Sequence, residues 1–455
     1  MNTNLYNTGR RLILTRNQGL IIGVLLVGTL GLPLLTEAGP PQPKEHTRYK
    51  LIDLGTLGGP SSGVAEAAQV LNNQGLVSGG ADTGNLDPFD PLCFAESCFV
   101  RHAFQWQNGV LADLRTLPGG GSSFANWVNE SGASAGASQN GLIDPLTGIP
   151  EQVAVLWHHG EIINLGTFGG AFSQANALNN RGQVIGFAQN AIPDESSLVG
   201  LGTQTRAFLW QHGVMRDLGT LGGPDAFAQY INERGQVAGF SYIDSAPTET
   251  TGLPAVHAFL WQDGRMLDLG SLGGNWAEVS DMNNRGQITG FMNLPGDESH
   301  HPFLWERGTL RDLGTFGGSN GGATWLNDAE EVVGTADFPG DQLHNAFFWR
   351  NGVMIDLGNL GITSAGKFIN SKGQVVGASR VSRVPSQASA FIWVNGGPMI
   401  DLNTLIPANS PLHLVSADCI NDRGEISGTG VPAGVSSDDT ETLGHAFLLI
   451  PVHAE

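Results

Sequence analysis

A single phrase that recurs along the chain constrains the fold more than any other feature. HAFLWQDGRMLDLGSLGG (residues 257–274) has close relatives through most of the 455 residues. Three markers return in fixed order, and each occurs eight times: INxxGQVxG, AFxW and DLGTLGG. Catalysis needs one constellation of side chains rather than eight copies of it. We therefore interpret the phrase as a structural unit of a repeat architecture.

The markers give the boundaries and the length of the repeats. Successive DLG-type markers are 44 to 60 residues apart. The DLG-type markers start at Asp53, Asp113, Asn164, Asp217, Asp268, Asp312, Asp356 and Asp401. The asparagines of the IN-type markers are Asn72, Asn129, Asn179, Asn232, Asn283, Asn327, Asn370 and Asn421.

Each repeat is predicted to form four short antiparallel strands. In the fourth repeat these are 227–232, 235–242, 257–262 and 265–270, which we refer to as strands a, b, c and d. The Asp-Gly, Asn-Gly or His-Gly pair between strands c and d is a strong two-residue hairpin signal. AFLW is apolar on both faces of the strand, so neighbouring sheets must cover it on both sides. A four-stranded sheet covered in this way is a propeller blade, whereas a parallel β-helix has no use for such hairpins.

The two ends of the repeat region complement each other. Residues 49–55 form a strand d without the rest of its repeat, and residues 445–452 form a strand c without a strand d. Pairing the two segments completes one unit and removes two exposed edges. We therefore expect an all-β fold, an eight-bladed β-propeller over residues 48–455 closed by its N-terminal strand. Seven blades plus one distorted unit is the alternative.

The first residues are typical of an export signal. Three arginines precede an apolar run from Gly19 to Leu35, and Thr36-Glu37-Ala38 offers small residues to a signal peptidase. We predict a signal peptide over 1–38 and a linker over 39–47. An uncleaved membrane anchor is the alternative. Cleavage predicts a secreted protein, extracellular or periplasmic, with no membrane span in the mature chain.

Composition excludes two classes of protein. The chain has 40% hydrophobic and only 14% charged residues, so it can bury enough apolar surface to fold. The formal net charge is −20, with no Lys/Arg cluster beyond the N-terminus. A nucleic-acid partner requires such cations, so we expect none. We expect a monomer whose ligand is an extracellular glycan, cation or protein.

The combination INxxGQVVG, HAFLW and DLGTLGG resembles the bacterial HAF family of probable extracellular repeat proteins. The resemblance covers nearly the whole mature chain, from Asp53 to Leu449, and the name-giving His-Ala-Phe stands at His102, His257 and His445. It implies an exported protein built of repeats and without a known catalytic activity. Repeats 2 and 7 depart from the pattern, at Val153-Ala154-Val155 and at Gly361-Ile362.

Residues that recur in the repeats are predicted to have structural roles. The Asp of each DLG marker should accept backbone N–H groups in the turn that follows it. The histidines before the AF or PF pairs (His102, His257, His301, His445) are one per repeat, so a metal site would require several blades to converge. We expect these histidines to bond a neighbouring backbone group, and we predict no metal site from them.

The connections between strands b and c vary in length and contain 17 Asp/Glu residues against three Arg. These connections share one face of a propeller, and variable loops on a rigid frame are where binding residues concentrate. The alternative is that they only keep an exported protein soluble. The candidate binding residues are Asp82, Asp87, Asp90, Asp194, Asp244, Asp297, Asp341 and Asp438. No cofactor is expected, although residues 82–90 contain oxygen ligands of the kind that Ca²⁺ takes without EF-hand spacing.

Two of the three cysteines lie in one such connection. Export favours a disulfide between Cys93 and Cys98, with free or metal-bound thiols as the alternative. Cys419 is predicted to be a buried free thiol.

These observations predict a non-enzymatic binding or surface-interaction scaffold. The alternative is a propeller enzyme, similar to a glycosidase or a lyase, that uses paired carboxylates such as Asp297-Glu298 on the same face. No local signature of Ser/His/Asp or Cys/His catalysis occurs in the sequence.

Overall fold

A computed structural model describes residues 47–383 and 386–452. The chain divides into two units, Met1–Thr47 and Arg48–Glu455, and the account below concerns the second. The predicted signal peptide (1–38) lies outside the described residues, and so does the linker (39–47) except for Thr47.

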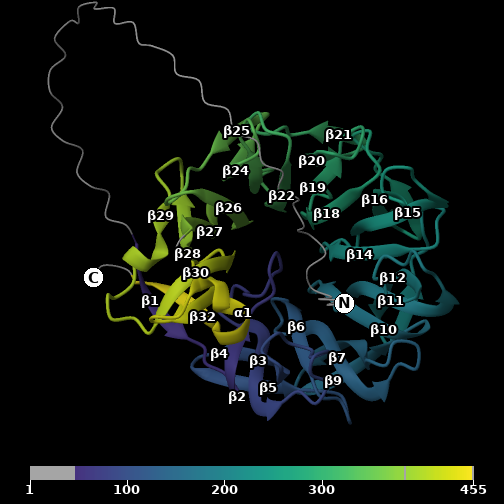
Figure 1. Cartoon of the computed structure of the whole chain (residues 1–455), viewed down its shortest axis with the longest axis horizontal. Helices are drawn as coiled ribbons and strands as arrows, with labels where there is room; N and C mark the ends of the chain where they lie inside the picture. Colours follow the sequence, from purple (N-terminus) through teal and green to yellow (C-terminus); the bar gives the residue numbers. More distant parts are fainter. Residues whose placement is uncertain (1–46, 384–385, 453–455) are drawn as a thin grey trace, which may run out of the picture. The chain divides into compact units, whose positions relative to one another are not determined.

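The prediction of an all-β fold is confirmed: strands make up most of the second unit and form groups of four that follow one another around a centre (Figure 1). The second and third groups are joined into one eight-stranded sheet by a parallel bridge between Gln152 and Phe172. Every pairing within a group is antiparallel, as in a meander of four strands. We number the groups 1 to 8 in chain order. Groups 1 to 4 consist of β2 Gly58–Gly63, β3 Val77–Leu86, β4 Phe99–Gln107 and β5 Val110–Arg115; β6 Ser123–Val128, β7 Ser134–Ile143, β8 Pro150–His158 and β9 Glu161–Gly166; β10 Gly169–Leu178, β11 Val184–Pro193, β12 Thr203–Gln211 and β13 Val214–Asp217; β14 Ala226–Ile231, β15 Val237–Pro247, β16 Pro254–Gln262 and β17 Arg265–Asp268.

The other four groups have the same strand order, and short helices occur only near the C-terminal end of the described chain. Groups 5 to 8 consist of β18 Ala277–Met282, β19 Ile288–Asn293, β20 His300–Glu306 and β21 Thr309–Asp312; β22 Gly321–Leu326, β23 Val332–Asp337, β24 His344–Arg350 and β25 Val353–Asp356; β26 Thr363–Ile369, β27 Gln374–Arg383, β28 Ser386–Val394 and β29 Ile400–Asp401; β30 Leu412–Ile420, β31 Ile426–Pro432, β32 His445–Val452 and β1 Arg48–Asp53. The helices are η1 Leu402–Thr404, η2 Ser437–Asp439 and α1 Thr440–Leu443. None of the helices in the described part of the chain has the length and apolar composition needed to traverse a bilayer.

Group 8 is assembled from both ends of the second unit. β1 pairs with β32 in antiparallel register, from Arg48 opposite Val452 to Asp53 opposite Phe447. Tyr49 N–H also donates to the carbonyl of Leu405, 3.0 Å away, at the end of group 7. The pairing of 49–55 with 445–452 that the sequence predicts is therefore present.

Strand b and strand c are longer than predicted in several groups. In group 4 strand b runs to Pro247 and strand c starts at Pro254, so most of the predicted connection (240–256) is a β-hairpin arm. Groups 5 and 6 keep a short connection, because their b strands end at Asn293 and Asp337. The first strand of group 1 differs from those of the other groups. In group 1, β2 covers Gly58–Gly63, and the stretch that leads to Asn72 is irregular.

The core lies between neighbouring groups and depends on one close approach. The phenylalanine of each AFxW-type marker except the second, which has Val155, is fully buried; these residues are Phe104, Phe208, Phe259, Phe303, Phe347, Phe391 and Phe447. Gly239 on strand b passes between Phe259 and the backbone of strand a. A Cβ on Gly239 would lie 2.0 Å from the carbonyl oxygen of Phe227, so glycine is the residue that this crossing accepts.

Candidate functional site

The DLG aspartates act as turn anchors, as predicted. Asp268 Oδ1 accepts the N–H of Gly270 at 2.7 Å, and the equivalent residue of every other repeat accepts the N–H of the residue two positions later. This bond closes the turn that follows strand d. The repeated aspartates are therefore structural.

The HAF histidines were predicted to bond a backbone group, but in all four the Nδ1 atom instead lies 2.9–3.0 Å from the nearest carboxylate oxygen of a DLG aspartate; the pairs are His102–Asp113, His257–Asp268, His301–Asp312 and His445–Asp53. His445 has a backbone hydrogen bond as well, with Pro60. In repeats 3 and 6 the same place is taken by Arg206–Asp217 and Asn345–Asp356. Each pair joins strand c to strand d on the outside of its sheet, so these histidines are structural too.

The asparagines of the IN marker form a closed circuit. The side-chain amide of each donates to the backbone carbonyl of the next asparagine at 3.0–3.2 Å, and Asn421 donates to Asn72 to complete the ring. The side-chain oxygen of each also accepts the N–H four residues later. All eight asparagines are buried. A fully satisfied buried network of this kind holds neighbouring sheets in fixed register.

The residue after each of these asparagines belongs to a second ring, which we call the rim. Around the rim, amide or hydroxyl residues alternate with acids: Asn73, Glu130, Asn180, Glu233, Asn284, Asp328, Ser371 and Asp422. A rim side chain accepts the backbone N–H of the preceding rim residue, as Asn180 does from Glu130 at 2.8 Å and Glu233 does from Asn180 at 3.1 Å. Four carboxylates thus encircle the axis at the a–b turns.

In four repeats the residue two positions before the asparagine is aromatic and lies at the axis. Trp127, Tyr230, Trp325 and Phe368 form an aromatic cluster that we call the plug. The ring centroids of Trp127 and Trp325, from groups 2 and 6, are 6.1 Å apart. Tyr230 Oη donates to the carbonyl of Ala67 in group 1 at 3.0 Å, so the plug also ties group 4 to group 1.

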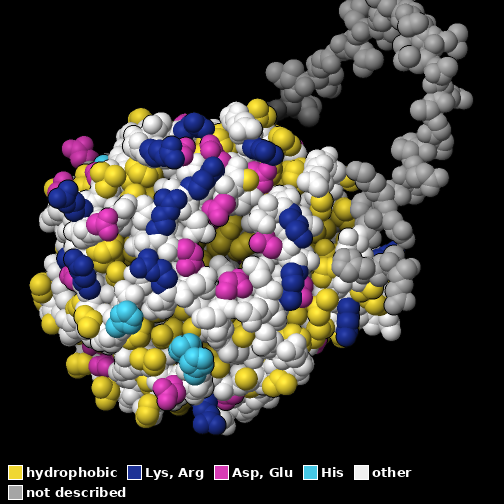
Figure 2. Space-filling model, turned by 180° about the vertical axis from the view of Figure 1, so that it is seen from behind, with side chains coloured by type: hydrophobic (Ala, Val, Ile, Leu, Met, Phe, Trp, Pro, Cys, Tyr) yellow, Lys and Arg dark blue, Asp and Glu magenta, His cyan; other side chains and the backbone are white. Residues whose placement is uncertain are grey.

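Rim and plug together enclose a depression on the axis with a cavity volume of about 260 Å³. Figure 2 shows a hollow near the centre of one face, with a hydrophobic floor, Asp and Glu side chains around it, and Lys and Arg side chains farther out. The cations nearest to the rim in sequence follow it directly in the a–b turns; they are Arg181, Arg234, Arg285, Lys372 and Arg423. A concave site with an apolar floor and a few polar groups is the usual form of a ligand pocket.

One carboxyl group lines this depression from below the rim. Asp281 occupies a plug position, is 4% exposed, and accepts the N–H groups of Met282 and Leu326. Burial raises the pKa of Asp281 to about 8, the two N–H groups oppose this rise, and the charge of Asp328 on the rim adds to it. Near neutral pH this carboxyl is therefore largely protonated and can donate a hydrogen bond.

A second charged cluster, from groups 7, 8 and 1, contains one cation and two carboxylates. Lys367 Nζ lies 2.7 Å from Asp418 and 3.0 Å from Glu66, carboxylates of groups 8 and 1. Burial lowers the pKa of Lys367, but the two carboxylates outweigh burial and raise it. This lysine is therefore a structural cation rather than a nucleophile.

The eight aspartates predicted as a binding face are placed by the structure mostly as local anchors. Asp82 lies in β3, is fully buried and pairs with Arg101 at 2.7 Å. Asp87 accepts N–H bonds from residues 89 and 94, and Asp194 and Asp244 each accept the N–H two residues later. Asp297 accepts four hydrogen bonds, and Asp341 accepts the N–H of residue 319.

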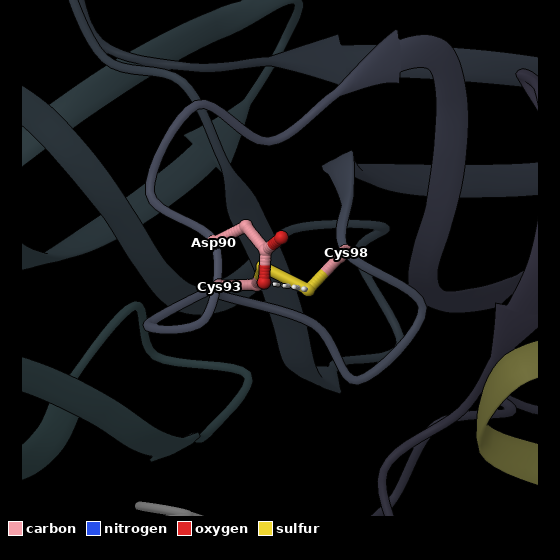
Figure 3. Close-up of side chains that lie close together, drawn as sticks. All are labelled: Asp90, Cys93 and Cys98. Carbon is pink, nitrogen blue, oxygen red and sulfur yellow. Dashed lines mark hydrogen bonds between the residues drawn. A yellow bond between two sulfur atoms is a disulfide. The ribbon is translucent and has the colours of Figure 1, made fainter.

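Asp90 and Asp438 are exposed on their loops. Asp90 Oδ1 lies 4.0 Å from Cys98 Sγ, and the structure joins Cys98 to Cys93 by a disulfide (Figure 3). Within 47–383 and 386–452, Asp90 with these two cysteines is the only group of three ligand-type residues close enough to share an ion. The sulfurs are bonded to each other, so only one carboxylate remains as a ligand. The third cysteine, Cys419, is buried, and burial raises the pKa of its thiol to about 12.

A carboxyl pair stands where groups 8 and 1 meet on the b–c side. Glu441 in α1 hydrogen-bonds Glu96 of the disulfide loop, and this bond, with burial and the charge of Glu96, raises the pKa of Glu441 to about 7. Both residues are exposed. The sequence-based candidate list did not include this pair.

The depression was also missed from the sequence, although a signal for it exists. When the repeats are aligned on the IN asparagines, the next position alternates between Asn/Ser and Glu/Asp, and the position two before it holds the aromatic residues.

No family model matches the chain, and no curated protein matches it. Solved structures with a similar fold include the β-propeller domain of the Trilobed protease from Pyrococcus furiosus, at 10% identity over 76% of this chain and 96% of that chain with a TM-score of 0.42. They also include an acylaminoacyl peptidase from Pyrococcus horikoshii, at 11% identity over 83% of this chain and 58% of the peptidase, with a TM-score of 0.39. TolB from Acinetobacter baumannii matches at 13% identity over 70% of this chain and 80% of TolB, with a TM-score of 0.35.

Proposed function

We propose that this protein is an exported, non-enzymatic binding module: an eight-bladed β-propeller of the HAF-repeat kind whose ligand enters the depression on the axis. In this proposal residues 1–38 are removed on export, each four-stranded group is one blade, and β1 closes the ring. The mature chain is a monomer in the extracellular or periplasmic space.

The observation that carries the proposal is how the side chains are used. The residues repeated eight times are occupied by turns, strand clamps and the asparagine circuit. The side chains that differ between repeats converge on the axis, where they form the plug and the rim around a cavity. Function is expected where a rigid repeated frame presents residues that it does not itself require.

A paired substitution in one turn tests the site. Ser371→Trp places a large ring in the mouth of the depression, whereas Lys372→Trp places the same ring one position away, outside the rim. The mature chain is screened against arrayed glycans, amines and peptides, and each hit is measured again with both variants. We expect Ser371→Trp alone to abolish binding. If the ligands found bind Ser371→Trp as tightly as they bind the wild-type chain, the depression is not the ligand site.

The enzymatic alternative has one observation in its favour, the Glu96–Glu441 pair. Glycoside hydrolysis uses two carboxyl groups, one of which has a raised pKa and acts as the general acid; Glu441 beside Glu96 has such a raised pKa, although neither residue lines the depression on the axis. Hydrolysis of any arrayed glycan by the wild-type chain, lost in Glu441→Gln and kept in the matched variant Asp439→Asn, would establish this alternative and contradict the non-enzymatic proposal.

A further inference from the structure

The rim carries more negative charge than its structural role requires. Asn180 and Asn284 accept the preceding rim N–H at 2.8 and 3.0 Å through neutral amides. Glu233 and Asp328 accept the equivalent bond at 3.1 and 2.9 Å through carboxylates. An amide would serve the interlock at all of these positions, so the fold does not explain the four acids.

These four carboxylates accept hydrogen bonds from neighbouring rim residues but have no cationic partner among the described residues. Glu130, Glu233, Asp328 and Asp422 form no ion pair with any residue of the described ranges, whereas neighbouring charges such as Lys367 and Arg423 do. Four like charges around one axis repel one another, and each would be more favourable beside a cation. A cation placed among the four carboxylates would relieve this repulsion, so the rim favours an occupant with positive charge.

The plug, which forms the floor of the depression, gives a second and independent indication of the class of ligand. Trp127, Tyr230, Trp325 and Phe368 line the cavity, where they offer apolar area and aromatic rings. Aromatic rings attract cations electrostatically and also stack on planar apolar bodies. The protonated carboxyl of Asp281 adds one hydrogen-bond donor or acceptor at the same level.

We infer that the depression binds an amphiphilic organic cation, with its apolar or aromatic body on the plug and its ammonium group inside the ring of rim carboxylates. This inference rests on the proposed function and deepens it by giving the class of ligand. The four carboxylates disfavour an anion inside the rim. A neutral glycan stacked on the plug is the competing ligand, and the experiment below separates the two.

Titration calorimetry of the mature chain with benzyltrimethylammonium, and with benzyl alcohol as its uncharged counterpart, tests the inference. We expect the cation to bind at least about tenfold more tightly than the alcohol, and its affinity to fall as salt is added. In a variant that combines Glu130→Gln, Glu233→Gln, Asp328→Asn and Asp422→Asn, this preference should disappear. These amides keep the acceptors of the interlock, so thermal melting should show a folded chain.

The control removes the same number of charges elsewhere, at four exposed glutamates outside the rim: Glu161→Gln, Glu195→Gln, Glu249→Gln and Glu298→Gln. Cation binding should survive in this variant. If the two probes bind equally well, or if both variants lose the cation equally, the cation class is overturned. The proposed function would still hold in that case if either probe, or an arrayed glycan, bound to the wild-type chain but not to Ser371→Trp. Absence of binding by both probes to the wild-type chain overturns the inference outright.

Discussion

The two faces of the ring use polar residues in opposite ways. On the a–b face every turn has the same length, and each turn bonds to the next through the asparagine circuit and the rim. On the b–c face the connections differ in length, and most of their carboxylates bond within their own loop or to a neighbouring one. The first face is one connected structure, whereas the second is a set of local ones.

This difference shows where a composite site can form. Eight short turns, each contributing one residue, build a rim that no single repeat contains. The longer acidic loops are more conspicuous in the sequence, but most of their candidate aspartates hydrogen-bond within the loops or to neighbouring residues. Length and charge of a loop are therefore a poor guide to binding in a ring of repeats, because the uniform turns converge on the axis.

The largest expected effect comes from opening the ring. A chain that starts at residue 56 lacks β1, and with it the buried side chains of Tyr49 and Leu54 and the pairing with β32. We expect a loss of about 4–6 kcal/mol relative to a chain that starts at residue 48, from lost apolar burial and unpaired backbone groups. Chemical denaturation measures this loss. A synthetic peptide of residues 48–55 should restore part of it, whereas a scrambled peptide should not.

Breaking the asparagine circuit should have the next largest effect. Asn283→Ala removes the donor to the carbonyl of Asn327 and the acceptor for Gln287 N–H in a buried network. We expect about 2–3 kcal/mol of destabilisation in urea unfolding, because buried partners lose their hydrogen bonds. Asn284→Ala in the same turn is exposed and should cost less than about 1 kcal/mol. Equal losses of stability in the two variants would contradict the conclusion that the buried circuit stabilises the fold more than the exposed rim does.

The latch between the chain ends should depend on pH. The hydrogen bond with Asp53 raises the pKa of His445, although burial opposes it. Burial alone would raise the pKa of Asp53, but the bonds from His445 and Gly55 outweigh it and lower the pKa.

The stabilisation from His445 is therefore fully present below its unfolded pKa of about 6.5 and is lost as pH rises through the folded pKa. The stabilisation from Asp53 is present above its unfolded pKa of about 3.9 and is lost as the pH falls through the lower folded pKa. His445→Asn, which copies the Asn345–Asp356 pair of group 6, should cost about 1 kcal/mol at pH 5.5 and almost nothing at pH 9. The same cost at both pH values would show that charge has no part in the latch.

The smallest effect is expected on the b–c face. Asp244 is exposed and accepts one N–H bond from its own arm, which an asparagine can also accept. Asp244→Asn should therefore change the free energy of unfolding by less than about 0.5 kcal/mol. A loss as large as that of Asn283→Ala would remove the distinction between the two faces.

Much of the fold follows from the sequence because each strand is specified locally. The Asp-Gly and Asn-Gly pairs fix the c–d hairpins, and the orphan segments 49–55 and 445–452 fix the closing pair. The His–Asp clamps could also have been predicted, since histidine precedes aspartate by 11 residues in His102–Asp113 and in His257–Asp268.

The candidate site was harder to predict because its contacts join different repeats. Asn283 and Asn327 are 44 residues apart, and Trp127 meets Trp325 across the axis. Such contacts exist only once the ring closes and shows which end of each strand lies at the centre. The loop aspartates were misleading for a related reason: the sequence shows the charge of Asp297 but not the four groups that bond it.

Hydrogen–deuterium exchange of the mature chain, read by mass spectrometry, tests most directly whether the a–b face is one cooperative structure. The account predicts that peptides covering the eight IN turns exchange slowly and at one common rate, because each turn opens only when its neighbours do. Peptides from the b–c connections should exchange faster and at unrelated rates. Eight unrelated rates at the IN turns, or exchange there faster than in the b–c connections, would contradict the account.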